Sequence, residues 1–214
     1  MGTVTDVARP TAKGEATRNR ILEIAEAAIL SKGFDATSIE EIVAGAEITR
    51  SGFFYHFSDK NLLARALIER YIEQDRVLLD GIFARAAELS DDPLQRLLIG
   101  LKLFAELMED LPNGHPGCLV ATVCYQERLF DAEVRELNRQ AVLGWRDQFL
   151  AQLEPVAARY RPREPVDLAA LADLISTTVE GGIVMAKALR EPKVLSEQVL
   201  LMRGLIKLLF TPET

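Results

Sequence analysis

The sequence has few of the residues that most often carry catalysis or bind metals. Its 214 residues include two cysteines, two histidines and one tryptophan. Cys118 and Cys124 do not form a CxxC pair, so neither a disulfide framework nor a zinc site is indicated. The HExxH, GxSxG, phosphate-loop and GxGxxG motifs do not occur in it. We therefore expect no enzymatic activity, no metal and no cofactor.

Long hydrophobic runs and excess positive charge are also missing. No run of about eighteen apolar residues occurs, and residues 1–20 lack the apolar core of a secretory signal. The net charge is −7, whereas a general nucleic-acid binder carries a basic surface. We expect a cytoplasmic protein without a membrane span, in which any contact with DNA is confined to a small region.

What the sequence does have is helical periodicity. Apolar residues make up 49% of the chain, which is enough for a sizeable core, and no alternating strand pattern appears. Clusters of proline and glycine separate the periodic segments and end them. The sequence therefore predicts an all-α protein, with helices near 17–31, 39–46, 49–57, 60–79, 93–109, 118–127, 131–153, 167–190 and 194–210.

Residues 37–63 contain several helix-start signals close together. Thr37 and Ser38 each precede a glutamate by three residues, Thr49 can cap a second short helix, and Ser58 can cap a third. Helices this short are marginal alone and must be held by packing. Two short helices joined by a turn of three to four residues are typical of a helix-turn-helix.

The second short helix carries small and hydrogen-bonding side chains on the face opposite its apolar residues. An arginine there can contact guanine edges, and hydroxyl, imidazole and ammonium groups can contact phosphates. The residues predicted to contact DNA are Thr37, Ser38, Thr49, Arg50, Ser51, Gly52, Tyr55, His56 and Lys60.

The segment TRNRILEIAEAAILSKGFDATSIEEIVAGAEITRSGFFYHFSDKNLL, residues 17–63, resembles the DNA-binding domain of the TetR/AcrR family of transcriptional regulators. The resemblance implies a three-helix helix-turn-helix head on a larger helical body that binds a ligand and dimerises. On this basis residues 1–16 are a flexible basic arm, 17–63 the DNA-binding domain and 64–214 the body. Glu47 stands where the family commonly has a turn glycine.

The resemblance implies a repressor that leaves its operator DNA when a small-molecule inducer binds. We expect this inducer to be largely apolar. An apolar stripe around Trp145 is either plain core or part of the ligand pocket. The candidate ligand-binding residues are Leu101, Phe104, Met108, Cys118, Tyr125, Gln126, Trp145, Phe149, Glu180 and Val184.

A reading helix of this length contacts few base pairs, so we expect a homodimer that spans two half-sites. The apolar faces of the last two predicted helices can form a four-helix bundle with a second copy. The candidate interface residues are Leu171, Leu174, Ile175, Thr178, Gly182, Met185, Leu189, Leu201, Leu205 and Leu208.

Two other functions remain open. Cys118 is expected in the first turn of a helix, where the helix dipole favours a thiolate, so the protein could instead sense oxidants or electrophiles. Its acidic balance also suits a helical scaffold protein without a DNA partner.

Overall fold

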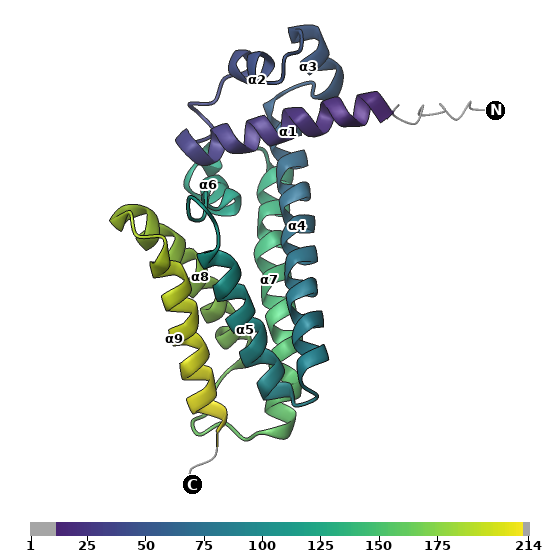
Figure 1. Cartoon of the computed structure of the whole chain (residues 1–214). Helices are drawn as coiled ribbons and strands as arrows, with labels where there is room; N and C mark the ends of the chain where they lie inside the picture. Colours follow the sequence, from purple (N-terminus) through teal and green to yellow (C-terminus); the bar gives the residue numbers. More distant parts are fainter. Residues whose placement is uncertain (1–11, 212–214) are drawn as a thin grey trace, which may run out of the picture.

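A computed structural model describes residues 12–211 of the chain. Over this range the protein is helical and contains no strand, as predicted (Figure 1). The helices are α1 (Ala12–Lys32), α2 (Ile39–Gly45), α3 (Arg50–His56), α4 (Lys60–Leu89), α5 (Pro93–Glu109), α6 (Leu119–Tyr125), the 3₁₀ helix η1 (Glu127–Leu129), α7 (Ala132–Arg159), α8 (Leu168–Leu189) and α9 (Lys193–Phe210).

The two short helices of the head begin at hydroxyl caps. Ser38 Oγ accepts from the backbone N–H of Glu41, and Thr49 Oγ1 accepts from that of Gly52, both at 3.1 Å. Helices of seven residues are unstable alone, so tertiary packing must hold them. The side chain of Phe53 is fully buried in a core shared with α1, α2 and α4. The caps therefore set where α2 and α3 begin, and packing in the core holds the two helices in place.

Helix α4 begins one residue later than it would if Ser58 were its N-cap. Asp59 is the N-cap, and its Oδ1 accepts from the backbone N–H of Leu62 at 2.9 Å. Ser58 instead donates to Asp59 Oδ2 at 2.9 Å. The expectation that Ser58 caps this helix was wrong, because the carboxylate takes the capping position.

The head and the body share one helix and part of one core. The boundary expected between residues 63 and 64 falls inside α4, which runs without a break from the head to the far end of the body (Figure 1). The apolar core of the head continues to Ile68 and includes Leu119 and Val123 of α6. The head therefore rests directly on α4 and α6.

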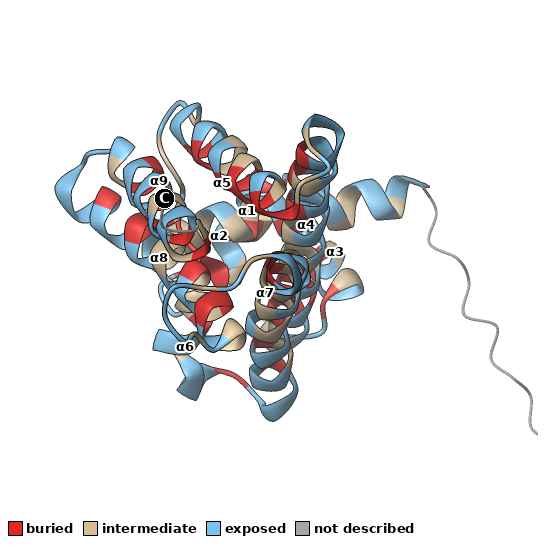
Figure 2. Ribbon diagram, turned by 90° about the horizontal axis from the view of Figure 1, so that it is seen from below, coloured by how far each residue is buried: buried red, intermediate tan, exposed pale blue. Residues whose placement is uncertain are grey.

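In the body, α4, α5, α7, α8 and α9 enclose a second core. Figure 2 shows the buried faces of these helices turned toward one another. A Cβ on Gly100 of α5 would come within 2.3 Å of the Phe83 ring of α4, so this contact needs glycine. Phe83 in turn meets Phe149 of α7 edge-on, with ring centroids 6.4 Å apart.

Several predicted helix limits differ from the structure. The five residues 12–16 belong to α1 rather than to an arm, and residues 1–11 lie outside the described part of the chain. Helix α4 extends to Leu89 rather than ending near 79, and α6 stops at Tyr125 and is followed by η1. Helix α7 continues through Pro155 to Arg159. Pro155 is exposed near the helix end, where water can bind the carbonyl that it leaves without a partner.

Among the described helices, α8 is long and apolar enough to cross a membrane by length and composition alone. The core helix of a folded protein meets the same test, and α8 packs against α7 and α9 here. Its apolar character fits a helix with one face in the core and another available to a partner.

Candidate functional site

The turn between α2 and α3 contains a residue in the left-handed conformation. Glu47 has a φ of 53°. Its backbone N–H donates to the carbonyl of Ala44, and that of Ile48 donates to the carbonyl of Val43, both at 3.2 Å. Such a turn favours glycine because other residues crowd their own backbone at positive φ. The chain therefore adopts the helix-turn-helix turn in spite of the glutamate.

Helix α3 presents a polar face to solvent. Arg50, Ser51 and Tyr55 are exposed on it, and Tyr55 has an exposed fraction of 84%. Arg50 lies 3.1 Å from the carboxylate of Glu40. Because both side chains are largely exposed, this ion pair is weak and the guanidinium can move to another anion.

His56 closes the end of α3 and is half-buried. Burial lowers the pKa of this histidine, and the nearby charge of Arg18 lowers it further. The ring is therefore neutral at pH 7 and has one N–H to donate. It meets the Tyr55 ring edge-on, with centroids 5.1 Å apart.

Two of the residues predicted to contact DNA have internal roles instead. Thr37 is buried and its hydroxyl donates to the carbonyl of Gly33 at 2.8 Å. The ammonium of Lys60 donates to the carbonyls of Thr37 at 2.6 Å and Phe34 at 3.4 Å. Lys60 thus holds the loop between α1 and α2, and the prediction that it contacts phosphate is not supported by its position.

The other predicted DNA residues lie on or beside α3. Thr49 and Ser51 are exposed, and their hydroxyls lie 3.0 Å apart at the start of this helix. Ser38 is exposed at the start of α2. Gly52 is half-buried, and a Cβ built there would lie 3.3 Å from Thr49 Oγ1. The structure brings most of the predicted set to one end of the head.

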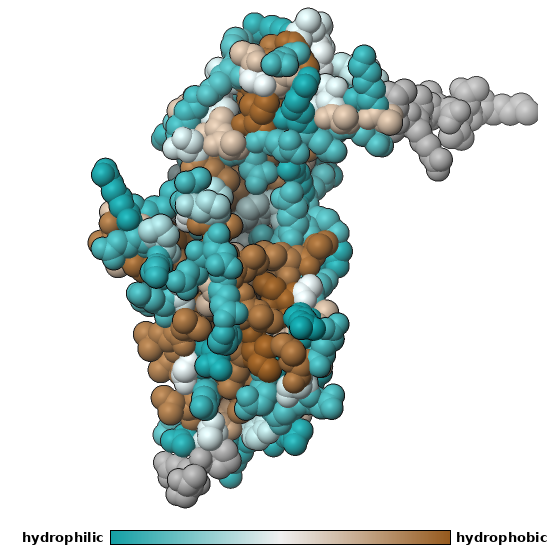
Figure 3. Space-filling model, viewed as in Figure 1, coloured by the Kyte–Doolittle hydropathy of each residue, from teal (hydrophilic) through white to brown (hydrophobic). Residues whose placement is uncertain are grey.

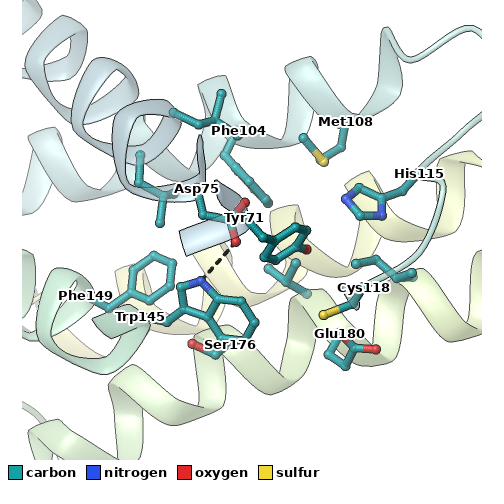
Figure 4. Close-up of a pocket in the computed structure, with 14 residues that line it drawn as sticks. Tyr71, Asp75, Phe104, Met108, His115, Cys118, Trp145, Phe149, Ser176 and Glu180 are labelled. Atoms are coloured by element: carbon teal, nitrogen blue, oxygen red, sulfur yellow. Dashed lines mark hydrogen bonds between the residues drawn. The ribbon is translucent and has the colours of Figure 1, made fainter. Parts of the chain in front are cut away.

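The body contains a cavity of about 90 Å³ between α4, α5, α7, α8 and the start of α6 (Figure 4). Its lining combines aromatic and aliphatic side chains with a few polar groups, the usual composition of a small-molecule site. The lining residues are Tyr71, Asp75, Leu78, Leu79, Phe104, Met108, His115, Cys118, Trp145, Phe149, Ser176, Val179, Glu180 and Ile183.

Six of the ten candidate ligand-binding residues line this cavity, namely Phe104, Met108, Cys118, Trp145, Phe149 and Glu180. The other four lie elsewhere. Leu101 packs in the core of the body, and Tyr125 is 83% exposed. Gln126 contacts the head, and Val184 points to solvent because it follows Ile183 by one residue on a helix.

Helix α4, His115 and three residues of α8 (Ser176, Val179 and Ile183) also line the cavity but were not among the candidates. Tyr71, Asp75 and Leu79 recur at four-residue steps and so share one face of α4, which was the available signal. The spacing alone does not predict which helix packs against this face of α4.

Asp75 and Trp145 form the main hydrogen bond inside the cavity. The indole Nε1 donates to Asp75 Oδ2 at 3.1 Å (Figure 4). Burial raises the pKa of Asp75 to about 6, although the indole bond favours the ionised form; the charge of Glu26 raises the pKa as well. A carboxylate with a raised pKa in a cavity is typical of a binding or functional site.

Cys118 is placed as predicted but is not activated. It is the N-cap of α6, and its Sγ accepts from the backbone N–H of Ala121 at 3.4 Å. Burial and the neighbouring Glu180 raise the pKa of the thiol to about 12. Helix α6 has seven residues, and its dipole does not overcome this desolvation. The protonated thiol does not support the thiol-sensor alternative.

Three candidate interface residues are inside the protomer. Leu171 and Ile175 are buried in the core of the body. Gly182 packs against α9, where a Cβ would come within 2.8 Å of Leu195. The prediction that these three face a partner was wrong, because the apolar band of α8 is wide enough for one edge to enter the core.

The remaining candidates form an exposed apolar surface on α8 and α9. Leu174, Met185, Leu189, Leu201, Leu205 and Leu208 have exposed fractions between 47% and 60%. Thr178 lies among them and is half-exposed. Figure 3 shows apolar residues gathered on the body, including the edge where α9 lies, below a more polar head.

The protein has a helix-turn-helix head that rests on a helical body with a cavity. This arrangement is typical of helix-turn-helix regulatory proteins. Comparison with known proteins agrees, because the family model described as bacterial regulatory proteins, tetR family, matches residues 21–67. The match covers the head and the start of α4, so this part of the chain is similar to TetR-family regulators.

Among relatives, the transcriptional regulator TtgR of Pseudomonas putida is 35% identical over 142 residues, 64% of each chain. The chain thus matches less than two thirds of that relative's length. The transcriptional repressor KstR2 of Mycobacterium tuberculosis is 29% identical over 161 residues, 71% of this chain and 72% of that protein.

Solved structures share the whole fold. A TetR transcriptional regulator from Chloroflexus aurantiacus is 25% identical, with a TM-score of 0.75 over 92% of this chain and 97% of the other. A TetR-family regulator from Agrobacterium tumefaciens has a TM-score of 0.75 at 21% identity, over 92% of this chain and 100% of the other.

Proposed function

We propose that this protein is a transcriptional repressor that binds operator DNA through α3 and releases it when a small molecule occupies the cavity. The observation that carries the proposal is that the same elements line the cavity and support the head. Helix α4 supplies Tyr71 and Asp75 to the cavity and Lys60 to the loop between α1 and α2. A change in cavity occupancy can therefore reach the head directly.

Helix α6 provides a second connection. Its N-cap, Cys118, lines the cavity. Its C-cap, Gln126, accepts from the backbone N–H of Phe34 at 2.9 Å and donates to Asp35 at 2.7 Å. A displacement of α6 would therefore pull on the loop that precedes α2.

The proposal includes a homodimer formed through the exposed apolar surface of α8 and α9. Helix α3 has seven residues and is about 10 Å long, so one copy contacts few base pairs. Two copies held at a fixed separation can occupy two half-sites of an operator. A ligand that changes this separation lowers DNA affinity, and operator DNA then lowers ligand affinity by the same factor. We place this activity in the cytoplasm, where the DNA is.

Electrophoretic mobility shifts on genomic fragments selected by the wild-type protein test the DNA-binding face. Arg50→Ala should weaken binding by about 1 to 3 kcal/mol if the guanidinium contacts a base. Tyr55→Ala should weaken it as well, because the exposed phenol can donate to phosphate.

Arg85→Ala is the matched control, since Arg85 is an exposed arginine of α4 paired with Glu88 in the body, away from the head. It should bind like the wild type. Unchanged affinity in both Arg50→Ala and Tyr55→Ala would refute the placement of α3 in the DNA groove.

A further inference from the structure

The lining of the cavity has an unbalanced charge. It contains the carboxyl groups of Asp75 and Glu180, while none of the described lining residues is a lysine or an arginine. Burial lowers the pKa of His115, and the charge of Lys187 lowers it further, so this imidazole is neutral at pH 7. No positive side chain in the lining therefore compensates the two acids.

The hydrogen bonds made by these acids do not replace a cation. Asp75 accepts from the neutral indole of Trp145, and Glu180 lies against the Cys118 thiol. Figure 4 shows Asp75 and Glu180 at separate places on the cavity wall, one beside the indole and the other beside the thiol. A buried carboxylate without a positive partner is costly, and a ligand cation removes much of that cost.

The rest of the lining also suits a cation with an apolar body. Tyr71, Phe104, Trp145 and Phe149 contribute aromatic rings. The negative face of such a ring attracts ammonium groups, most strongly where water is excluded. Leu79, Val179 and Ile183 add aliphatic surface for the uncharged part of a ligand.

We propose that the cavity binds an organic monocation, an ammonium group attached to a small apolar body, with Asp75 and Glu180 as the groups that select the positive charge. This inference rests on the proposed function only in assigning the cavity as the ligand site. It excludes carboxylates and phosphate esters, since either would place an anion beside two acids. The cavity of about 90 Å³ fits only a small ring or its equivalent, so larger cations must displace the lining side chains.

Binding of three probes of similar size tests the charge preference. Benzylamine is a cation at neutral pH, benzyl alcohol is neutral and benzoate is an anion. Isothermal titration calorimetry on the full-length protein without DNA should show benzylamine binding at least about tenfold tighter than benzyl alcohol, with no binding of benzoate. The fluorescence of Trp145, the single tryptophan, should change with benzylamine.

The isosteric variants Asp75→Asn and Glu180→Gln should each reduce the preference for benzylamine over benzyl alcohol. Glu73→Gln is the control, because Glu73 lies on the same helix but is exposed and paired with Arg76. It should keep the wild-type preference. Circular dichroism establishes that each variant is folded before its affinity is compared.

Three results would overturn the inference: equal or tighter binding of benzyl alcohol or benzoate, no cation binding at millimolar concentration, or an unchanged preference in both isosteric variants. Release of operator DNA is measured separately. Release caused only by neutral or anionic compounds overturns the cation assignment and leaves the repressor function standing. Cation binding without DNA release sustains the assignment and refutes the proposed coupling.

Discussion

Replacement of Glu47 by glycine should stabilise the protein. Glu47 has a φ of 53°, and an L-residue in the left-handed conformation costs about 1 to 2 kcal/mol. Glycine removes this strain but makes the unfolded chain more flexible, which costs about 0.4 to 1 kcal/mol. The midpoints of these two ranges differ by about 0.8 kcal/mol, which is the expected net gain in the free energy of unfolding.

Urea unfolding followed by far-ultraviolet circular dichroism measures this gain. The midpoint should rise while the slope stays the same, because the amount of surface exposed on unfolding does not change. Protein concentration is kept constant, since the stability of a dimer depends on it. A thermal scan should show an increase of about 1 to 4 °C for a chain of this size.

Glu47→Ala is the control because it removes the same carboxylate and keeps a Cβ at positive φ. It should show none of the gain that comes from relieved strain. If Glu47→Gly is no more stable than Glu47→Ala, the reasoning from backbone strain is refuted. Both variants remove one negative charge from the head, so they should have the same salt dependence of DNA binding.

Three further predictions concern the dimer, the connection to the head and the cavity. Leu205→Glu should convert the proposed dimer to a monomer in sedimentation at micromolar concentration, because Leu205 is exposed in the apolar surface of α9; a variant that dimerises as tightly as the wild type would contradict the proposed interface. Gln126→Ala should lower the hydrogen-exchange protection of the Phe34 amide by about two- to tenfold, the equivalent of one lost hydrogen bond, and unchanged protection would contradict the link through α6. The pKa of Asp75 is raised in the folded state to about 6, so its contribution to stability is present at low pH and is lost as the pH rises through that value. Relative to Asp75→Asn, the wild type should lose about 1 to 2 kcal/mol between about pH 5 and 8; parallel pH profiles would show that burial of this carboxyl has no such effect.

Local sequence determined the helical class and most helix starts. Thr49 caps α3 as predicted, and Ser38 is the one of the two expected residues that caps α2, because a hydroxyl at the N-cap bonds a backbone N–H only three residues away. The limits of α5, Pro93–Glu109, also agree, since proline favours the first turn of a helix. Such signals act over a few residues and can be read without knowing the rest of the fold.

Tertiary structure decided what each helical face contacts. Lys60 and Thr37 looked available for DNA, but the Thr37 hydroxyl donates to one carbonyl of the loop between α1 and α2, and the Lys60 ammonium donates to two others. Leu171 and Leu174 belong to one apolar band, yet one is in the core and the other is exposed. Periodicity identifies a face of a helix and leaves open whether that face meets its own chain, a second copy or solvent.

The composition of the cavity lining was the feature that depended most on tertiary structure. Its acids come from α4 and α8, far apart in the sequence, and Asp75 meets Trp145 across 70 positions. The order of the residues was enough to predict these helices and the helix-turn-helix of the head. Only their packing decided that two carboxyl groups and several aromatic rings share one space, because burial and charge balance depend on which helices become neighbours.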